Sequence, residues 1–213
     1  MSTEPTSESG PEPSPSAVPA IAPPTRVLVL AAVAVIALGS DILTKALVVA
    51  HLEGGAPVRL LGGLVYFDVV RNSGAAFSMA TGLTWILSLI ALAVVVAIIW
   101  IAPRLRSVGW AIGLGLVLAG ALGNLVDRIF RAPAPLQGHV VDFISVFGPN
   151  AEYFAIFNVA DSCICVGGAL IVLLAAFGRD YDGGIGRRDR NGGGSTSARD
   201  KSAADKTEAD AAS

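Results

Sequence analysis

The sequence predicts an all-α membrane protein, a bundle of four transmembrane helices that carries a small extracytoplasmic β-hairpin or sheet on its outer face. Three observations lead to this prediction. The 213 residues are 53% hydrophobic and 15% charged, whereas an ordinary soluble domain carries about 25% charged residues. Four apolar stretches each approach the roughly 20 residues that a helix needs to cross about 30 Å of hydrocarbon. Polar side chains gather near one end of these stretches.

The four predicted spans define a core of residues 26–178. They lie at about 26–50, 82–102, 108–129 and 154–178. The flanking segments 1–25 and 179–213 are rich in small and polar residues and show no apolar periodicity. Such segments bury too little apolar surface to fold, so we expect two disordered tails.

Basic residues near the spans predict the orientation of the bundle. Most of them flank the same side, namely Arg26, Arg104, Arg106, Arg179, Arg187, Arg188 and Arg190. Because short cytoplasmic flanks are enriched in Lys and Arg, both tails are expected in the cytoplasm. The loops of about 51–81 and 130–153 then lie on the outer side.

The first outer loop carries the signal of a β-hairpin. Val58–Leu61 and Leu64–Val70 are β-prone runs, and Gly62-Gly63 between them has the composition of a two-residue turn. We expect this hairpin to lie on the membrane surface.

Glycines recur along the third span at small-residue spacing. They are Gly109, Gly113, Gly115, Gly120 and Gly123. Small residues let helices approach closely in lipid, so this pattern predicts a tightly packed helix.

Ionisable residues within the spans are candidate functional groups, because an unpaired charge at the centre of a bilayer costs about 3 kcal/mol or more. Asp41 and Lys45 are four residues apart and share a helix face. They form either a structural ion pair or a direct contact with substrate. Further polar residues follow at the outer ends of the third and fourth spans, namely Asn124, Asp127, Arg128, Asn158 and Asp161.

The second outer loop adds a carboxylate among apolar neighbours. Asp142 precedes the turn signal Gly148-Pro149-Asn150, and folding back at that turn would bring it toward Asp161. Two carboxylates in a desolvated site share one proton, so that one acts as base and the other as acid. This is the chemistry of aspartic peptidases. Asp127 is the alternative partner for Asp161, because it already lies at a helix end.

Other functional classes have less support. The sequence has no G-x-S-x-G, no H-E-x-x-H, no glycine-rich phosphate loop and no clustered His and Cys. The net charge of −2 comes largely from the tails and gives no reason to expect nucleic-acid binding. Intramembrane polar residues also occur in small transporters and channels, and a non-catalytic membrane subunit is a third possibility. A continuous pathway is disfavoured because the inner halves of the spans are almost entirely apolar.

Five sequence blocks, taken in order, resemble the lipoprotein signal peptidase (signal peptidase II) family. They are Asp41-Ile42-Leu43-Thr44-Lys45, Arg71-Asn72-Ser73-Gly74-Ala75-Ala76-Phe77-Ser78, Gly123-Asn124-Leu125-Val126-Asp127-Arg128, His139-Val140-Val141-Asp142-Phe143 and Phe157-Asn158-Val159-Ala160-Asp161-Ser162. The resemblance covers about residues 26–178. It departs at Ile42, where the family usually has Gln, and in the long segment 130–138.

The resemblance implies a bacterial inner-membrane aspartic endopeptidase that cleaves prolipoproteins on the amino side of a diacylglyceryl-modified cysteine, at the outer membrane face. It implies Asp142 and Asp161 as the catalytic pair. The implied substrate-binding or site-structuring residues are Asp41, Lys45, Asn72, Gly74, Asn124, Asp127, Arg128 and Asn158. We expect no metal or organic cofactor, contact with membrane lipid, a monomer, and inhibition by cyclic peptides of the globomycin type.

Overall fold

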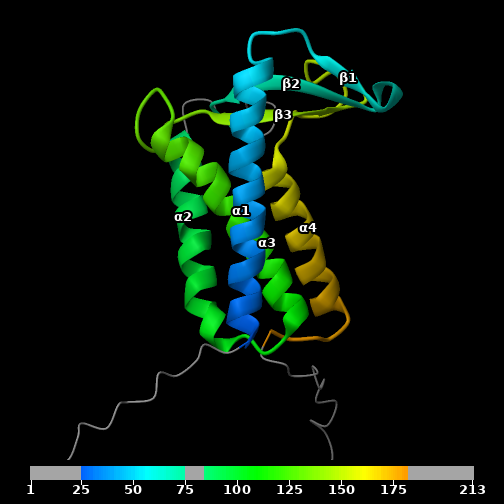
Figure 1. The fold of residues 1–213 in the computed structure, drawn as a ribbon. Coiled ribbons are helices and arrows are strands. Elements are labelled where there is room, and N and C mark those ends of the chain that lie inside the picture. The colour runs from blue at the N-terminus through cyan, green and yellow to red at the C-terminus, as the bar shows by residue number, and fades with distance from the viewer. Residues whose placement is uncertain (1–24, 75–83, 182–213) are drawn as a thin grey trace, which may run out of the picture.

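The computed structural model describes residues 25–74 and 84–181. Four helices run side by side in alternating directions, and a three-stranded sheet lies across one end of the bundle (Figure 1). The helices are α1 (Thr25–Leu52), α2 (Thr84–Ile101), α3 (Val108–Phe130) and α4 (Val159–Ala176). Each of the four is part of a helical segment long and apolar enough to cross a membrane, which confirms the predicted fold class.

Some of the predictions concern residues outside those that the structure describes. Most of the two predicted tails, residues 1–24 and 182–213, lies outside the described residues. The same is true of 75–78 in the second sequence block. Those predictions therefore stay predictions.

Helix α3 is the centre of the bundle and packs against α1, α2 and α4. In its most apolar stretch 61% of the residues are buried, and the mean hydropathy is 1.7. For α2 and the turn that follows it the corresponding values are 22% and 2.8. A helix that faces lipid must be apolar around its circumference, whereas a helix surrounded by protein can carry polar residues. The central position of α3 therefore explains how it accommodates a polar end.

Glycines permit the close contact between α3 and α4. A Cβ on Gly113 would lie 2.8 Å from Cγ1 of Ile171, and a Cβ on Gly167 would lie 2.6 Å from the carbonyl oxygen of Gly113. Both distances are shorter than real Cβ contacts. The two helices thus approach at glycine positions, as the small-residue pattern of the third span predicts.

The fourth helix starts later than the apolar stretch suggests. The predicted span began at 154, but α4 begins at Val159 and has Asn158 as its N-cap. Phe157 forms an antiparallel bridge with Ile144 instead. Pairing with the sheet and the N-cap together explain the later start.

The sheet has the order β1-β2-β3 with both pairs antiparallel. Its strands are β1 (Val58–Leu60), β2 (Val65–Asn72) and β3 (Val140–Val146). The predicted hairpin is present, but the prediction of a two-residue glycine turn is wrong. Leu60 pairs with Val65, so the connection is Leu61–Leu64. The side chain of Arg59 donates from Nη2 to the carbonyl oxygen of Gly62 at 2.6 Å and closes this longer turn.

Strand β3 lies within the segment that the sequence analysis treated as a loop. Its run of Val, Ile and Phe was the available signal for a strand. Pairing with β2 sets Asp142 opposite Val70. The third strand therefore positions one of the two predicted catalytic carboxylates.

Candidate active site

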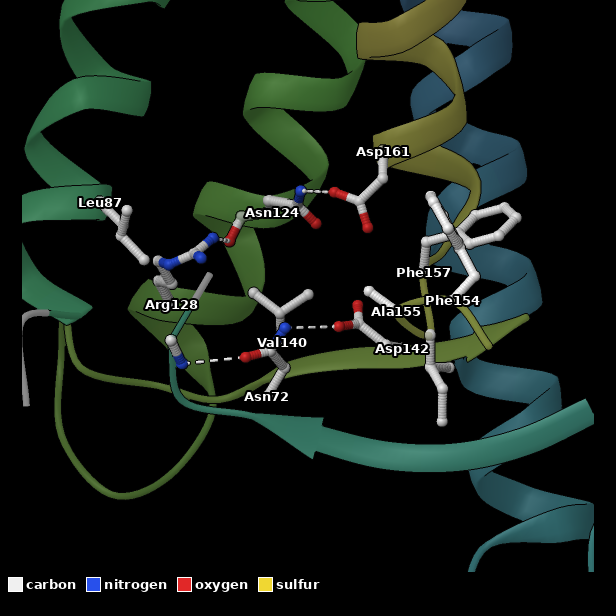
Figure 2. Close-up of a pocket in the computed structure, with 12 residues that line it drawn as sticks. Asn72, Leu87, Asn124, Arg128, Val140, Asp142, Phe154, Ala155, Phe157 and Asp161 are labelled. Carbon is white, nitrogen blue, oxygen red and sulfur yellow. Dashed lines mark hydrogen bonds between the residues drawn. The ribbon is translucent and has the colours of Figure 1, made fainter. Parts of the chain in front are cut away.

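A cavity of about 340 Å³ lies where the sheet meets the ends of the helices (Figure 2). We call it the central cavity. Six of the predicted site residues line it, namely Asn72, Gly74, Asn124, Arg128, Asp142 and Asp161. They come from β2 and the residues just after it, from α3, from β3 and from α4. The fold therefore brings distant parts of the chain to one site.

Asp142 of β3 and Asp161 of α4 both line the central cavity (Figure 2), and Asn158 connects them. Nδ2 of Asn158 donates to Oδ1 of Asp142 at 2.7 Å, and Oδ1 of Asn158 accepts from the backbone N–H of Asp161 at 2.9 Å. The backbone N–H of Asn158 donates in turn to Oδ2 of Asp161 at 3.1 Å, which completes a capping box. Asn158 thus holds both carboxyl groups, that of Asp142 through its side chain and that of Asp161 through its backbone N–H.

Asp142 is almost completely buried, with 3% of its surface exposed. Its Oδ2 accepts a hydrogen bond from Nδ2 of Asn72 at 2.7 Å. Burial, followed by the nearby charge of Asp161, raises the pKa of Asp142 to about 7, although the hydrogen bonds from Asn72 and Asn158 act in the opposite direction. A substantial fraction of Asp142 therefore holds a proton at neutral pH.

Asn124 orients the other carboxylate. Its Nδ2 donates to Oδ1 of Asp161 at 2.7 Å, while its Oδ1 accepts from Nδ2 of Asn158 at 3.2 Å. The same Oδ1 accepts from Nζ of Lys45 at 3.3 Å. Since an ammonium group only donates, Lys45 fixes the amide so that its NH₂ group points to Asp161.

Asp41, Lys45 and Asp127 form a buried charged cluster beside the central cavity, and none of the three lines it. Nζ of Lys45 lies 2.8 Å from Oδ2 of Asp41 and 3.0 Å from Oδ2 of Asp127. Asp41 also accepts from the backbone N–H of Ala160 at 2.9 Å, and Asp127 accepts from that of Val141 at 3.2 Å. This network ties α1 to α3, α4 and β3. It favours the ion-pair alternative for Asp41 and Lys45. It also holds the carboxylate of Asp127 in contacts with Lys45 and Val141.

Arg128 lines the central cavity and is 8% exposed. Its Nη1 donates to the carbonyl oxygen of Asn124 at 3.3 Å. Its Nε is buried and has no hydrogen-bond partner in the described part of the chain. An unmade hydrogen bond of a buried donor costs about 1–3 kcal/mol. The Nε of Arg128 is therefore available to an acceptor such as a peptide carbonyl.

The sequence analysis missed the small and apolar side chains that complete the wall. These are Leu87, Val140, Phe154, Ala155, Ile156 and Phe157. Val140 could have been found, because residues two apart on a strand share a face and Asp142 was already a candidate. Leu87 and Phe154 carry no local signal that separates them from other apolar residues of the chain.

Known signal peptidases resemble this chain in sequence. Residues 33–177 match the family model described as signal peptidase (SPase) II. A lipoprotein signal peptidase of Mycobacterium avium (strain 104) is 52% identical over 179 residues, which cover 84% of this chain and 95% of that protein. A lipoprotein signal peptidase of Mycobacterium tuberculosis (strain ATCC 25618 / H37Rv) is 54% identical over 171 residues, which cover 80% and 82%.

The fold also matches a solved structure, described as a bacterial membrane enzyme determined by the in meso method at 2.3 Å resolution. The TM-score is 0.60 at 28% sequence identity, and the match covers 71% of this chain and 87% of that chain. A second structure with the same description, at 1.9 Å resolution, gives a TM-score of 0.58 at the same identity.

Proposed function

The chain belongs to the signal peptidase II family, and on that premise we propose that Asp142 and Asp161 are the catalytic pair of an aspartic endopeptidase. The protein is a peptidase that removes signal peptides from prolipoproteins. The observation that best supports the catalytic pair is Asn158, which bridges two carboxyl groups on the wall of one cavity. Family membership favours this activity over the transporter or channel that the sequence also allows.

Asp142 is the acid of the pair. It is desolvated, and its pKa of about 7 lets it hold the shared proton near neutral pH. Asp161 lies in the first turn of α4, where the partial positive charge of a helix N-terminus favours an anion. It also accepts hydrogen bonds from Asn124 and from the backbone of Asn158. Asp161 is therefore the carboxylate that acts as base.

Hydrolysis uses a water molecule between the two carboxyl groups. Asp161 takes a proton from this water while the oxygen of the water bonds to the scissile carbonyl carbon. Protonated Asp142 polarises the carbonyl oxygen. Breakdown of the tetrahedral intermediate breaks the C–N bond, and Asp161 gives the proton that it took from the water to the leaving nitrogen. The products are a signal peptide with a free carboxyl terminus and a chain with a free α-amino group. The Nε of Arg128 holds a peptide carbonyl in place.

The substrate is a prolipoprotein whose cysteine carries a diacylglyceryl group, and cleavage occurs on the amino side of that cysteine. The central cavity joins helices that can cross a membrane to the sheet. A lipid anchor can therefore remain in the bilayer while the peptide bond reaches polar groups. Inhibitors of the globomycin type bind in the same cavity. The enzyme works as a monomer and needs no cofactor.

The site faces the outer side of the bacterial inner membrane. Arg26 and Arg104 belong to the end of the bundle opposite the sheet, where α1 starts and α2 ends (Figure 1). Because short cytoplasmic flanks are enriched in basic residues, that end faces the cytoplasm together with both termini. Residues 26–178 form the peptidase core.

A cleavage assay on a lipid-modified prolipoprotein in membranes tests the catalytic pair. We expect Asp142→Asn and Asp161→Asn each to lower kcat/KM at least about a thousandfold, as removal of essential acid–base groups does. Asp180→Asn is the control, because Asp180 lies beyond α4 and does not line the central cavity. Asp127→Asn should lower stability but retain cleavage per folded molecule.

Two results would contradict the assignment. If the Asp127 and Asp161 variants lose cleavage while the Asp142→Asn enzyme stays active, Asp127 and not Asp142 is the catalytic partner of Asp161. Cleavage that survives all substitutions would exclude an aspartic mechanism.

A further inference from the structure

A second cavity of about 290 Å³ adjoins the central cavity, and we call it the side cavity. Its lining residues are Val70, Asn72, Asp142, Asn150, Ala151, Ala155 and Ile156. Four of them also line the central cavity, namely Asn72, Asp142, Ala155 and Ile156. The catalytic candidate Asp142 therefore lies at the junction of two spaces.

Both cavities lie over one face of the sheet, at different positions along β2. Val70 is the partner of Asp142 across the sheet, and Asn72 is the partner of Val140. Cross-strand partners and residues two apart point to the same face. Val140 lines only the central cavity and Val70 lines only the side cavity. A peptide that passes Asp142 from the central cavity therefore continues along β2 toward Val70.

The two cavities differ in the elements that surround them. The central cavity includes Leu87 of α2, Arg128 of α3 and Asp161 of α4, so it reaches into the bundle. Among the residues that the structure describes, the lining of the side cavity comes only from β2, β3 and the segment 150–156, with no residue from a helix. A group that stays in the bilayer thus fits the central cavity. A chain that leaves the membrane fits the side cavity.

The walls of the side cavity are held by hydrogen bonds. The backbone N–H of Asn150 donates to Oδ2 of Asp68 at 2.6 Å, and the hydroxyl of Ser145 donates to the carbonyl oxygen of Gly148 at 2.6 Å. Across the cavity, the strand register is irregular just before Val70. Such irregularities re-aim side chains next to active sites. The cavity is therefore preformed.

We propose that the side cavity binds the first residues of the mature lipoprotein, those that follow the lipid-modified cysteine. The inference rests on the proposed function, because it places the scissile bond between Asp142 and Asp161. The signal peptide and the lipid then lie on the central-cavity side. Val70 and Ala151 line the side cavity and not the central cavity, so their side chains set the room for the residue after the cysteine.

Two panels of lipid-modified prolipoproteins test this assignment. In the first panel only the residue after the cysteine varies, from Gly and Ser to Leu and Trp. In the second panel only a residue before the cysteine varies. The enzymes are the parent, Val70→Ala, Val70→Phe and the control Val58→Phe. Val58 is 38% exposed, close to the 40% of Val70, and it lines neither cavity.

We expect the parent to cleave the Gly substrate faster than the Trp substrate. Val70→Ala should raise kcat/KM for the bulky substrates about tenfold, the size of the effect of a few methylene groups in a pocket. Val70→Phe should lower it by a similar factor. Neither variant should change the ranking in the second panel, and Val58→Phe should match the parent throughout.

The inference is overturned if the Val70 variants change neither panel, or if they change only the second panel. Cleavage of the Gly substrate by the parent, with its loss in Asp142→Asn, would still support the proposed function in that case. An active Asp142→Asn enzyme would overturn the proposed function and the inference together.

Discussion

Asn158 links the start of a helix to the chemistry of the site. Its side chain caps α4 by accepting a hydrogen bond from the backbone N–H of Asp161, and it also donates a hydrogen bond to Asp142. An Asn side chain has one acceptor and one donor end, and both are used here. The orientation that caps the helix is therefore also the orientation that holds Asp142 of the proposed catalytic pair.

The pH dependence of cleavage should report the proton on Asp142. Its pKa is raised to about 7, so the protonated acid is present below that pH and is lost as the pH rises through it. We expect kcat/KM to fall with increasing pH near 7. The hydrogen bond from Asn72 favours the charged form, so Asn72→Ala should raise the pKa further. The pH at which kcat/KM falls, the descending limb of the profile, should then shift to higher pH by as much as about one unit.

The position of the limb is the readout, because Asn72→Ala can also slow cleavage at every pH. Full pH profiles of parent and variant on the same substrate provide the comparison. A limb that stays in place, or that moves to lower pH, would contradict the assignment of the proton to Asp142.

The close contact of α3 and α4 explains why Asn124 reaches Asp161. Asn124 is on α3 and Asp161 is on α4, yet their side chains are 2.7 Å apart. Such short side chains meet only where the two backbones are near each other, and Gly120 permits this approach, because an added Cβ there would collide with the backbone of Ala160. Helix packing thus determines the geometry of the site.

Two adjacent glycines of α4 separate the effect of packing from that of helix propensity. Gly167→Ala should destabilise the protein by about 1–3 kcal/mol, because the new Cβ would meet the backbone of Gly113 and force the helices apart. Gly168→Ala is the matched control, since nothing lies within 4 Å of its added Cβ. Thermal unfolding in detergent measures both variants. Equal unfolding temperatures for the two would show that the contact does not restrict the helices.

The whole molecule places its polar residues at one end of an apolar bundle. Asp41, Lys45 and Asp127 are buried there and paired with one another. Removing one member of a buried ion pair costs about 3–5 kcal/mol, so the cluster has to remain complete. Helices suited to a bilayer and a sheet across one end together support a site at a membrane surface.

Labelling of single cysteines tests the proposed orientation. Ala56 is exposed just before β1, near the sheet, and Pro103 is exposed at the opposite end of the bundle. Each residue is replaced by Cys in a separate variant. Both are made in a chain in which Cys163 and Cys165 are replaced by Ala. In intact spheroplasts a membrane-impermeant maleimide should label position 56 at once and position 103 only after permeabilisation. The reverse pattern would place the site on the cytoplasmic side.

The sequence by itself determined the class of the fold and the candidate chemistry. Span length, low charge and glycine spacing are local properties, and they suffice to predict four packed membrane helices. The resemblance of five sequence blocks to the signal peptidase II family pointed to Asp142 and Asp161, and their catalytic role stays a prediction. Local composition also predicted a hairpin, although not the length of its turn.

Only the tertiary structure decided which polar groups meet. It placed Asp127 with Lys45 and outside the central cavity, paired β3 with β2, and brought Leu87 and Phe154 to the wall. These outcomes depend on the rotation of each helix and on the register of strands from distant segments. Such relations arise from packing between parts of the chain, so no local pattern of residues contains them.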